Sequence, residues 1–151
     1  MNGAWAVDQT LLIQFAVSSL MVVLCVGIHG LGLAALNHAM RTEAATERLR
    51  RIAPLSPRGI VFTLGVVIAM LALHGAEIWL FAFVYMAVGA IPQAEPALYF
   101  STISYSTVGF NDLHIAPQWR LLGAFESVLG IFLLGWSTAF FFRMIGRIDP
   151  H

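Results

Sequence analysis

The sequence contains no lysine, a single cysteine and few charged residues of either sign. Of its 151 residues, 11% are charged, and eight arginines balance eight acidic residues to a formal net charge of zero. A neutral chain argues against nucleic acid as a partner. One cysteine, Cys25, excludes an intrachain disulfide, so the sequence gives no information on redox compartment. We find no nucleophile paired with a base and expect no enzymatic activity.

Apolar residues are abundant instead. They make up 59% of the chain, and the mean hydropathy is +0.81. A soluble domain of this size needs more polar surface, so the composition predicts an integral membrane protein. Three stretches, at about residues 11–36, 60–91 and 121–142, are long enough to cross about 30 Å of hydrocarbon as helices. The first is too long for a cleavable signal peptide and lacks a basic segment before it.

Serine and proline mark the ends of the second span. Ser56 stands directly before Pro57, which is typical of a capping residue followed by proline at the first helical position. Pro92 is expected to close the span, because proline cannot continue a helix. These signals predict an outer helix at about residues 57–91.

A short helix is predicted between the second and third spans. Glu95 and Pro96 can open it, and at about residues 96–106 it is about 15 Å long, too short to cross the bilayer. Such a segment is typical of re-entrant structure, which survives at membrane depth only inside protein or beside water. Pro117 then opens an inner helix at about residues 117–146. We therefore expect an all-α membrane protein with three transmembrane helices and a re-entrant helix.

The arginines predict the orientation in the membrane. Seven of the eight follow the first span or the third: Arg41, Arg48, Arg50, Arg51, Arg58, Arg143 and Arg147. The positive-inside rule makes this side cytoplasmic. The N-terminus is then external, the C-terminus cytoplasmic, and the protein is expected in the plasma (inner) membrane. No span carries a periodic arginine array, and few residues follow Arg143, so we expect neither a voltage sensor nor a cytosolic ligand-binding domain.

The hydroxyl-rich stretch from Ser101 leads into the run Thr107-Val108-Gly109-Phe110-Asn111, each position of which meets a separate physical demand. Threonine offers a hydroxyl and a carbonyl, and valine packs outward to brace the strand. Glycine permits a positive φ that turns its carbonyl, and an aromatic residue wedges against neighbouring helices.

Placed between two apolar spans, this run resembles the pore helix and selectivity filter of potassium channels, in which backbone carbonyls replace the hydration shell of the ion. The resemblance covers about residues 58–146 and is to the bacterial potassium channel family with a two-transmembrane pore module. It implies a filter of residues 107–111 with K⁺ held at Thr107, Val108, Gly109 and Phe110, and no other cofactor. It also implies a homotetramer, because each chain supplies one filter strand of four. Residues 1–52 then form an extra N-terminal transmembrane helix with a cytoplasmic extension, and residues 53–151 form the pore domain.

One residue departs from the family pattern. The filter usually ends Gly-aromatic-Gly-Asp, whereas this chain has Gly109-Phe110-Asn111-Asp112. Asparagine is among the few residues that tolerate a left-handed backbone, so the strand can still form. Its amide lies near the outer mouth and can alter selectivity. A weakly selective channel for Na⁺ and K⁺ is therefore an alternative function.

Several polar residues are candidates for supporting the filter. Ser106 and Asp112 flank it, while Glu77 and Glu126 lie inside apolar spans and should face protein or water. His74 precedes Glu77 by three residues and shares its helix face. We expect Glu77, Glu126 and His74 to brace the pore helix through hydrogen bonds. Proton sensing by His74 is a second interpretation, and a metal site of His74, Glu77 and Glu126 is a third.

Two further features of the third span allow two interpretations each. Gly130 lies ten residues after Arg120, where the family carries its hinge glycine, yet a close helix contact explains a glycine there equally well. Phe140, Phe141 and Phe142 near the inner end form either a hydrophobic constriction or a packing and interfacial cluster.

The membrane histidines support an alternative of another class. His29 in the first span and His74 in the second are possible axial ligands in a haem-binding membrane anchor. That function leaves the Thr-Val-Gly-Phe run unexplained. His114 in the external loop is the more exposed candidate for proton sensing. A non-conducting auxiliary subunit is a third possibility.

Overall fold

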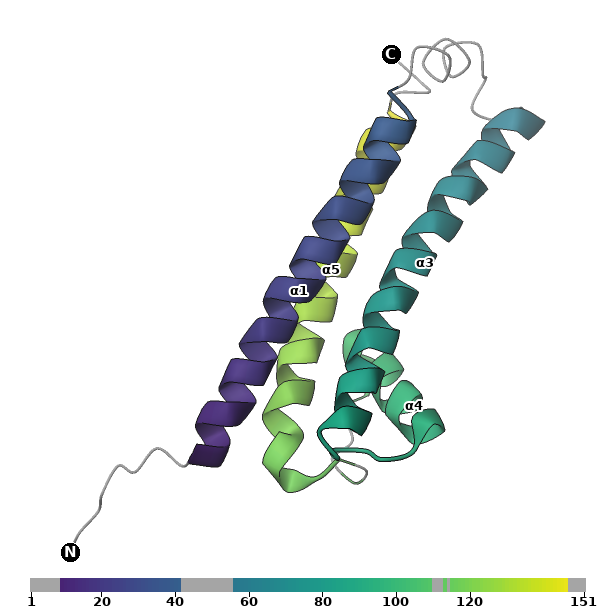
Figure 1. Cartoon of the computed structure of the whole chain (residues 1–151). Coiled ribbons are helices and arrows are strands. Elements are labelled where there is room, and N and C mark those ends of the chain that lie inside the picture. Colours follow the sequence, from purple (N-terminus) through teal and green to yellow (C-terminus); the bar gives the residue numbers. More distant parts are fainter. Residues whose placement is uncertain (1–8, 42–55, 110–112, 114, 147–151) are drawn as a thin grey trace, which may run out of the picture. The chain divides into compact units, whose positions relative to one another are not determined.

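The computed structural model describes residues 9–41, 56–109, 113 and 115–146, and within these residues it contains helices and turns but no strand. The helices are α1 (Gln9–Ala39), α3 (Pro57–Ala87), α4 (Ala94–Tyr105), the 3₁₀ turn η2 (Pro117–Trp119) and α5 (Arg120–Ile145) (Figure 1). The predicted all-α fold class is therefore confirmed.

Among the described residues, three helical segments are long and apolar enough to cross a membrane: Gln9–Ala39, Pro57–Ala87 and Pro117–Ile145. The helix α4 has 12 residues, about 18 Å at 1.5 Å per residue, which is too short to cross. The protein is thus a multi-pass membrane protein with one short helix between its second and third spans.

The start of α3 follows the prediction, whereas its end does not. The Ser56 hydroxyl accepts a hydrogen bond from the Gly59 N–H at 3.1 Å, as an N-cap does three residues into a helix. At the other end, α3 stops at Ala87, before the predicted boundary near residue 91. Gly89 adopts a φ of 70°, and the Ala90 N–H donates to the Tyr85 carbonyl at 2.8 Å. This glycine-based C-terminal motif ends the helix, so Pro92 is not the residue that closes it.

The helices on either side of the loop begin close to the predicted residues. Gln93 is the N-cap of α4, which places Glu95 in the first turn, where a negative charge is favourable. Pro117 opens the 3₁₀ turn that leads into α5. The Gln14 side chain of α1 accepts a hydrogen bond from the Leu121 N–H at 3.3 Å. The first span therefore contacts the start of the third.

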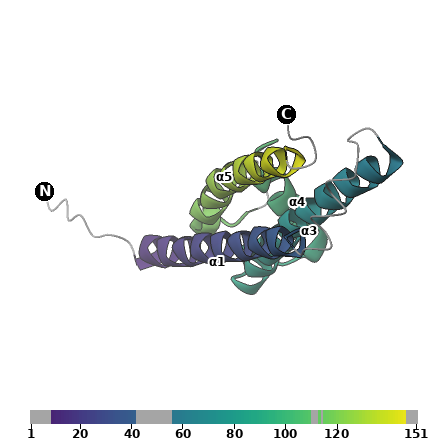
Figure 2. The same ribbon diagram turned by 90° about the horizontal axis from the view of Figure 1, so that it is seen from above.

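The chain divides into two compact units, each described here by itself. Unit 1 contains residues 1–25 and 78–131. In it, α4 lies against the C-terminal part of α3 (Figures 1 and 2), and the Tyr85 and Phe100 rings meet edge to face at 5.2 Å. Its largest fully buried side chains are Phe81, Tyr85, Phe100, Tyr105, Ile91, Leu122 and Glu126.

Unit 2 contains residues 26–77 and 132–151. Its core is a methionine-rich cluster of Met40, Val66, Met70 and Met144. Leu36, Phe62, Phe140 and Phe141 pack against this cluster. Since methionine is unbranched and fills irregular gaps, it suits a junction where three helices meet.

The described arginines are divided between the two units. Arg41, Arg58 and Arg143 belong to unit 2, and Arg120 belongs to unit 1. The side of the membrane on which these arginines lie stays a prediction. Arg48, Arg50, Arg51 and Arg147, which contribute to the same prediction, lie outside the described residues.

Candidate functional site

The short helix α4 buries one face and exposes the other. Its buried residues are Ala97, Phe100, Ser101, Ser104 and Tyr105, a spacing of three and four that places them on one side of a helix. Tyr99, on the other side, is 59% exposed. The buried face is unusual because it carries two serines beside its aromatic residues.

Ser101 is the polar centre of that face. Its hydroxyl lies 2.8 Å from the Ile78 carbonyl of α3 and 2.5 Å from Glu126 Oε1 of α5. The second carboxyl oxygen of Glu126 accepts a hydrogen bond from the Tyr85 hydroxyl at 2.5 Å. Ser101 and Glu126 are both fully buried. This network joins α3, α4 and α5 within unit 1.

The network bears on the predicted role of Glu126. The residue contacts α4 through Ser101. That this contact braces a pore helix stays a prediction. Tyr85 was not among the predicted site residues. The sequence nevertheless contained a signal for Tyr85. A carboxyl group inside a membrane span requires a hydrogen-bond donor at the same depth in the membrane, and Tyr85 near the end of α3 supplies one.

The C-terminal end of α4 turns sharply where the predicted filter begins. The Val108 N–H donates to the Ile103 carbonyl at 3.1 Å, and the Thr107 N–H donates to the Ser104 carbonyl at 3.0 Å. This pair of bonds is the Schellman pattern, which needs a left-handed residue after the helix. Thr107 takes that place with a φ of 57°.

A left-handed threonine is strained. For a residue with a Cβ atom this conformation costs about 1–2 kcal/mol, and glycine or asparagine is the usual choice. The expectation that Gly109 has the positive φ is wrong, because among the described residues of this segment the left-handed backbone is at Thr107. Strain held by surrounding structure is common at functional sites.

Two serines near this turn differ in their partners. The Ser106 hydroxyl donates to the Thr102 carbonyl at 2.7 Å. The Ser104 hydroxyl is buried and has no hydrogen-bond partner among the residues that the structure describes. A buried hydroxyl without a partner is energetically costly.

The outer part of the predicted filter lies outside the described residues. This applies to Phe110, Asn111, Asp112 and also to His114. Thr107, Val108 and Gly109 are described, and all three are exposed in the single chain.

Gly130 of α5 lies directly against the end of α4. A Cβ atom built on Gly130 would overlap the Tyr105 carbonyl. Of the two interpretations of this glycine, the close helix contact is therefore the one that the geometry supports. Its role as a hinge stays a prediction.

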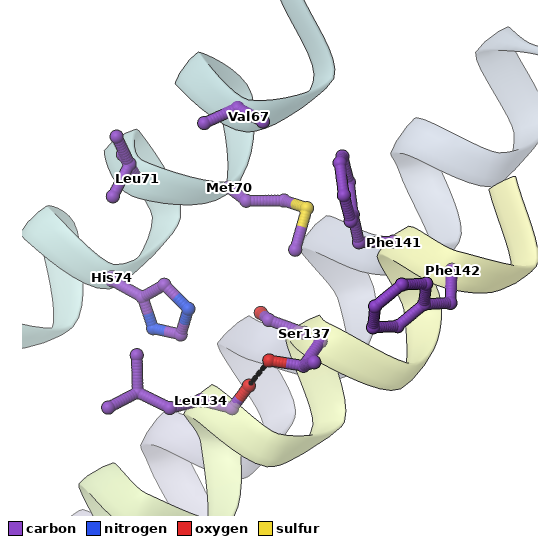
Figure 3. Close-up of a pocket in the computed structure, with 9 residues that line it drawn as sticks. Val67, Met70, Leu71, His74, Leu134, Ser137, Phe141 and Phe142 are labelled. Atoms are coloured by element: carbon purple, nitrogen blue, oxygen red, sulfur yellow. Dashed lines mark hydrogen bonds between the residues drawn. The ribbon is translucent and has the colours of Figure 1, made fainter. Parts of the chain in front are cut away.

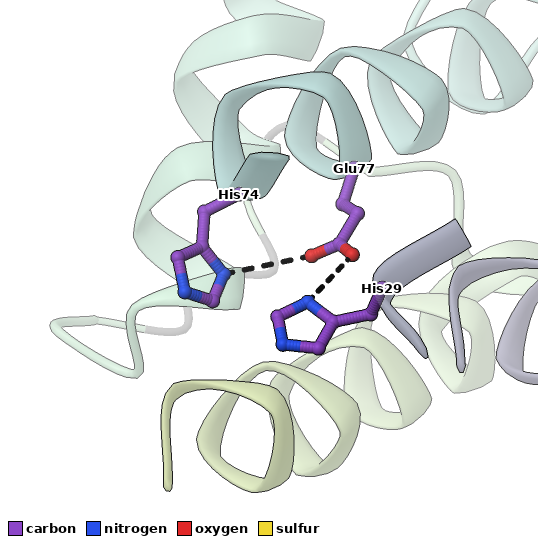
Figure 4. A group of neighbouring side chains, drawn as sticks. All are labelled: His29, His74 and Glu77. Carbon is purple, nitrogen blue, oxygen red and sulfur yellow. Dashed lines mark hydrogen bonds and ion pairs between the residues drawn. The ribbon is translucent and has the colours of Figure 1, made fainter. Parts of the chain in front are cut away.

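Glu77 and His74 have contacts in unit 2, where α4 does not belong. Glu77 Oε1 lies 2.9 Å from His29 Nδ1 of α1, and Glu77 Oε2 lies 3.5 Å from His74 Nδ1 (Figure 4). The metal-ligand group that the described residues form is therefore not the predicted one of His74, Glu77 and Glu126. Glu126 belongs to the network in unit 1, and His29 takes its place beside the other two.

The same contacts argue against a haem held by His29 and His74. Their ring centroids are 5.2 Å apart, and the rings are tilted by 40°. Since both rings also contact the Glu77 carboxylate, no porphyrin plane fits between them.

The three predicted gate residues have different surroundings in unit 2. Phe140 and Phe141 pack against the methionine-rich cluster, which supports the packing interpretation for these two. Phe142 is 67% exposed. Phe141 and Phe142 also line a cavity of about 300 Å³ between α3 and α5, whose polar lining residues are His74, Ser137 and Thr138 (Figure 3).

Comparison with known protein families identifies the family of this chain. The family model described as "Ion channel" matches residues 59–147, more than half of the chain, from the start of α3 past the end of α5. No match to the chain is found among curated proteins or among solved structures.

Proposed function

Because this chain belongs to the ion channel family, we propose that it is a potassium-selective channel that conducts K⁺ passively through a filter of residues 107–111. The supporting observation is the position of the Thr-Val-Gly-Phe-Asn run. It follows a helix too short to cross the membrane, which lies between the two spans of the matched region.

The filter lies at the C-terminal end of α4. A helix carries a partial negative charge at this end, which favours a cation nearby. Carbonyl oxygens of Thr107, Val108, Gly109 and Phe110 are proposed to replace the hydration shell of K⁺. The Thr107 hydroxyl adds one further oxygen at the inner end of the run.

One chain supplies one copy of this short strand, so a closed ring of carbonyl oxygens requires several chains. We propose a homotetramer in which α5 lines the central cavity and α4 points its C-terminal end at the axis. The buried contact between Ser101 and Glu126 then holds α4 at a fixed angle to α5. In this assembly the N-terminus is external and the C-terminus cytoplasmic, in the plasma membrane.

Ion flux from proteoliposomes tests the selectivity. Wild-type protein is reconstituted with K⁺ or Na⁺ gradients, and the reversal potential is measured in mixed ions. We expect a clear preference for K⁺, and an Asn111→Gly variant should keep or strengthen it because glycine restores the usual filter pattern. Leu113→Ala is the control, since this side chain is 84% exposed and lies just beyond the filter.

A weakly selective cation channel is the second candidate, and Asn111 is the observation that favours it. In that case wild type shows similar permeability to Na⁺ and K⁺, and Asn111→Gly shifts the reversal potential toward that of K⁺. Reconstituted protein that passes neither ion would contradict both functions and would favour a non-conducting auxiliary subunit.

A further inference from the structure

Three ionisable side chains meet in unit 2. They are His29 of α1 and His74 and Glu77 of α3, with exposed fractions of 0%, 7% and 0%. Ionisable groups inside membrane spans are costly, and they usually mark a function. None of these three residues belongs to the run of residues 107–111 or to the network of Tyr85, Ser101 and Glu126, so their clustering needs its own explanation.

The spacing of their polar atoms is that of a metal coordination shell. His29 Nδ1 lies 2.9 Å from Glu77 Oε1, and His74 Nδ1 lies 3.5 Å from Glu77 Oε2. Each residue offers one ligand atom, and the three atoms lie within 4.8 Å of one another. Tetrahedral zinc with bonds of about 2.0–2.1 Å holds its ligands about 3.3 Å apart. The distance from His29 to Glu77 is shorter than this value, and the distance from His74 to Glu77 is longer.

A contact outside the three ligand atoms orients the His29 side chain. His29 Nε2 lies 3.2 Å from the Ser137 hydroxyl of α5. Metal-binding histidines generally use their other nitrogen in this way, which fixes the ring and its tautomer. The Trp136 ring lies beside His29 as well, with centroids 5.4 Å apart.

An access route is present on the other side of the cluster. His74 and Ser137 both line the cavity of about 300 Å³ between α3 and α5 (Figure 3). Three protein ligands leave one tetrahedral position open, as in catalytic and regulatory zinc sites, and water in the cavity can fill it.

From this geometry we propose that His29, His74 and Glu77 form a binding site for a divalent transition metal ion of the zinc class. Two imidazoles and one carboxylate suit zinc, whereas calcium and magnesium require shells of oxygen ligands. The bound ion ties α1 to α3, and Ser137 connects the site to α5. The site thereby fastens the N-terminal span to the family-matched region of the chain.

Metal binding to the purified full-length chain is the first test. Protein in detergent is stripped with a chelator, incubated with Zn²⁺, separated from free ion and assayed for metal content. We expect about one Zn²⁺ per chain in wild type. Glu77→Gln and His29→Gln should lower the affinity at least tenfold, and Ser137→Ala should lower it about tenfold because it removes the orienting partner.

Two control variants keep their metal if the proposal is right. Glu126→Gln alters another buried carboxyl group, outside this cluster, and His38→Gln alters the histidine in the last turn of α1. Zinc content that stays at the wild-type level in both Glu77→Gln and His29→Gln overturns the site. Equal losses in the two controls would overturn it also, because the effect would then be general.

A variant that replaces one metal-binding side chain with another gives a positive signal. A protein that fails to fold cannot produce that signal. In His74→Cys a thiolate replaces the imidazole, so Co²⁺ added as a spectroscopic probe should give a sulfur-to-metal absorption band that wild type lacks. Appearance of the band places residue 74 in the coordination shell, and its absence from folded, metal-treated protein contradicts the proposal. Neither measurement depends on ion flux, so failure of the metal site and failure of the channel function are distinguishable.

Discussion

At the residue scale, the two acids inside the membrane spans illustrate how partners decide what a buried carboxyl group does. Glu126 accepts a hydrogen bond from the Tyr85 hydroxyl and contacts Ser101, so it joins α3, α4 and α5. Glu77 faces two histidines. The same residue type therefore joins three helices in one unit and takes part in a candidate metal site in the other.

Removal of the Ser101 hydroxyl should destabilise the protein. Ser101→Ala leaves one oxygen of Glu126 without its hydroxyl partner, and an unsatisfied buried group costs about 1–3 kcal/mol. The measurement is thermal or denaturant unfolding in detergent. Thr102→Ala is the matched control, because that hydroxyl is exposed and bonds only to its own helix at Leu98. Equal stability losses in the two variants would speak against the network.

At the element scale, α4 is held in place by its neighbours. It has 12 residues, and a helix of this length is marginal on its own, so tertiary contacts must stabilise it. Those contacts are the buried face around Phe100 and Ser101 and the close approach to Gly130. The turn with the left-handed Thr107 follows α4 directly.

A methyl group at Gly130 should disturb this element. Gly130→Ala forces α5 away from the Tyr105 carbonyl, and overpacking of this kind costs about 1–3 kcal/mol. The free energy of unfolding and the K⁺ preference of the reconstituted protein should both decrease. Gly135→Ala provides the comparison on the same helix, since nothing lies within 4 Å of its added Cβ. That variant should be neutral or slightly stabilised, by about 0.5–1 kcal/mol from helix propensity.

At the scale of the whole molecule, large apolar side chains remain uncovered on the spans. Examples on α5 are Val128, Ile131 and Phe132, with exposed fractions of 72%, 61% and 64%. In a membrane protein such faces contact lipid or other copies of the chain. If α5 lines a pore between several copies of the chain, part of this apolar surface must be buried in contacts between the copies.

Mixing experiments should report the number of chains in the pore. Gly109→Arg places charge and bulk in the filter and should abolish flux by itself. When equal amounts of wild-type and variant chains assemble randomly into tetramers, only about 6% of the assemblies contain wild type alone. Flux should fall to about that fraction. A remaining flux near one half would indicate independent single chains, and Leu113→Ala in place of the blocking variant gives the undiminished reference.

Hydropathy and local chemistry in the sequence determined most of the elements. The three spans follow from apolar length alone, because a bilayer requires about 20 apolar helical residues whatever their order. Ser56 before Pro57 identified the start of α3. The end of α3 was misplaced because Pro92 was given more weight than Gly89, although a glycine after a helix is itself a local signal.

The tertiary structure alone decided which polar groups meet. The spans are apolar on all sides, so their sequences indicate no inward face from which the direction of Glu77 or Glu126 follows. Contacts such as those of Tyr85 with Glu126, and of His29 with Glu77, depend on the rotation and depth of each helix. Rotation and depth are set by packing between helices, which joins residues 41 and 48 positions apart in the chain.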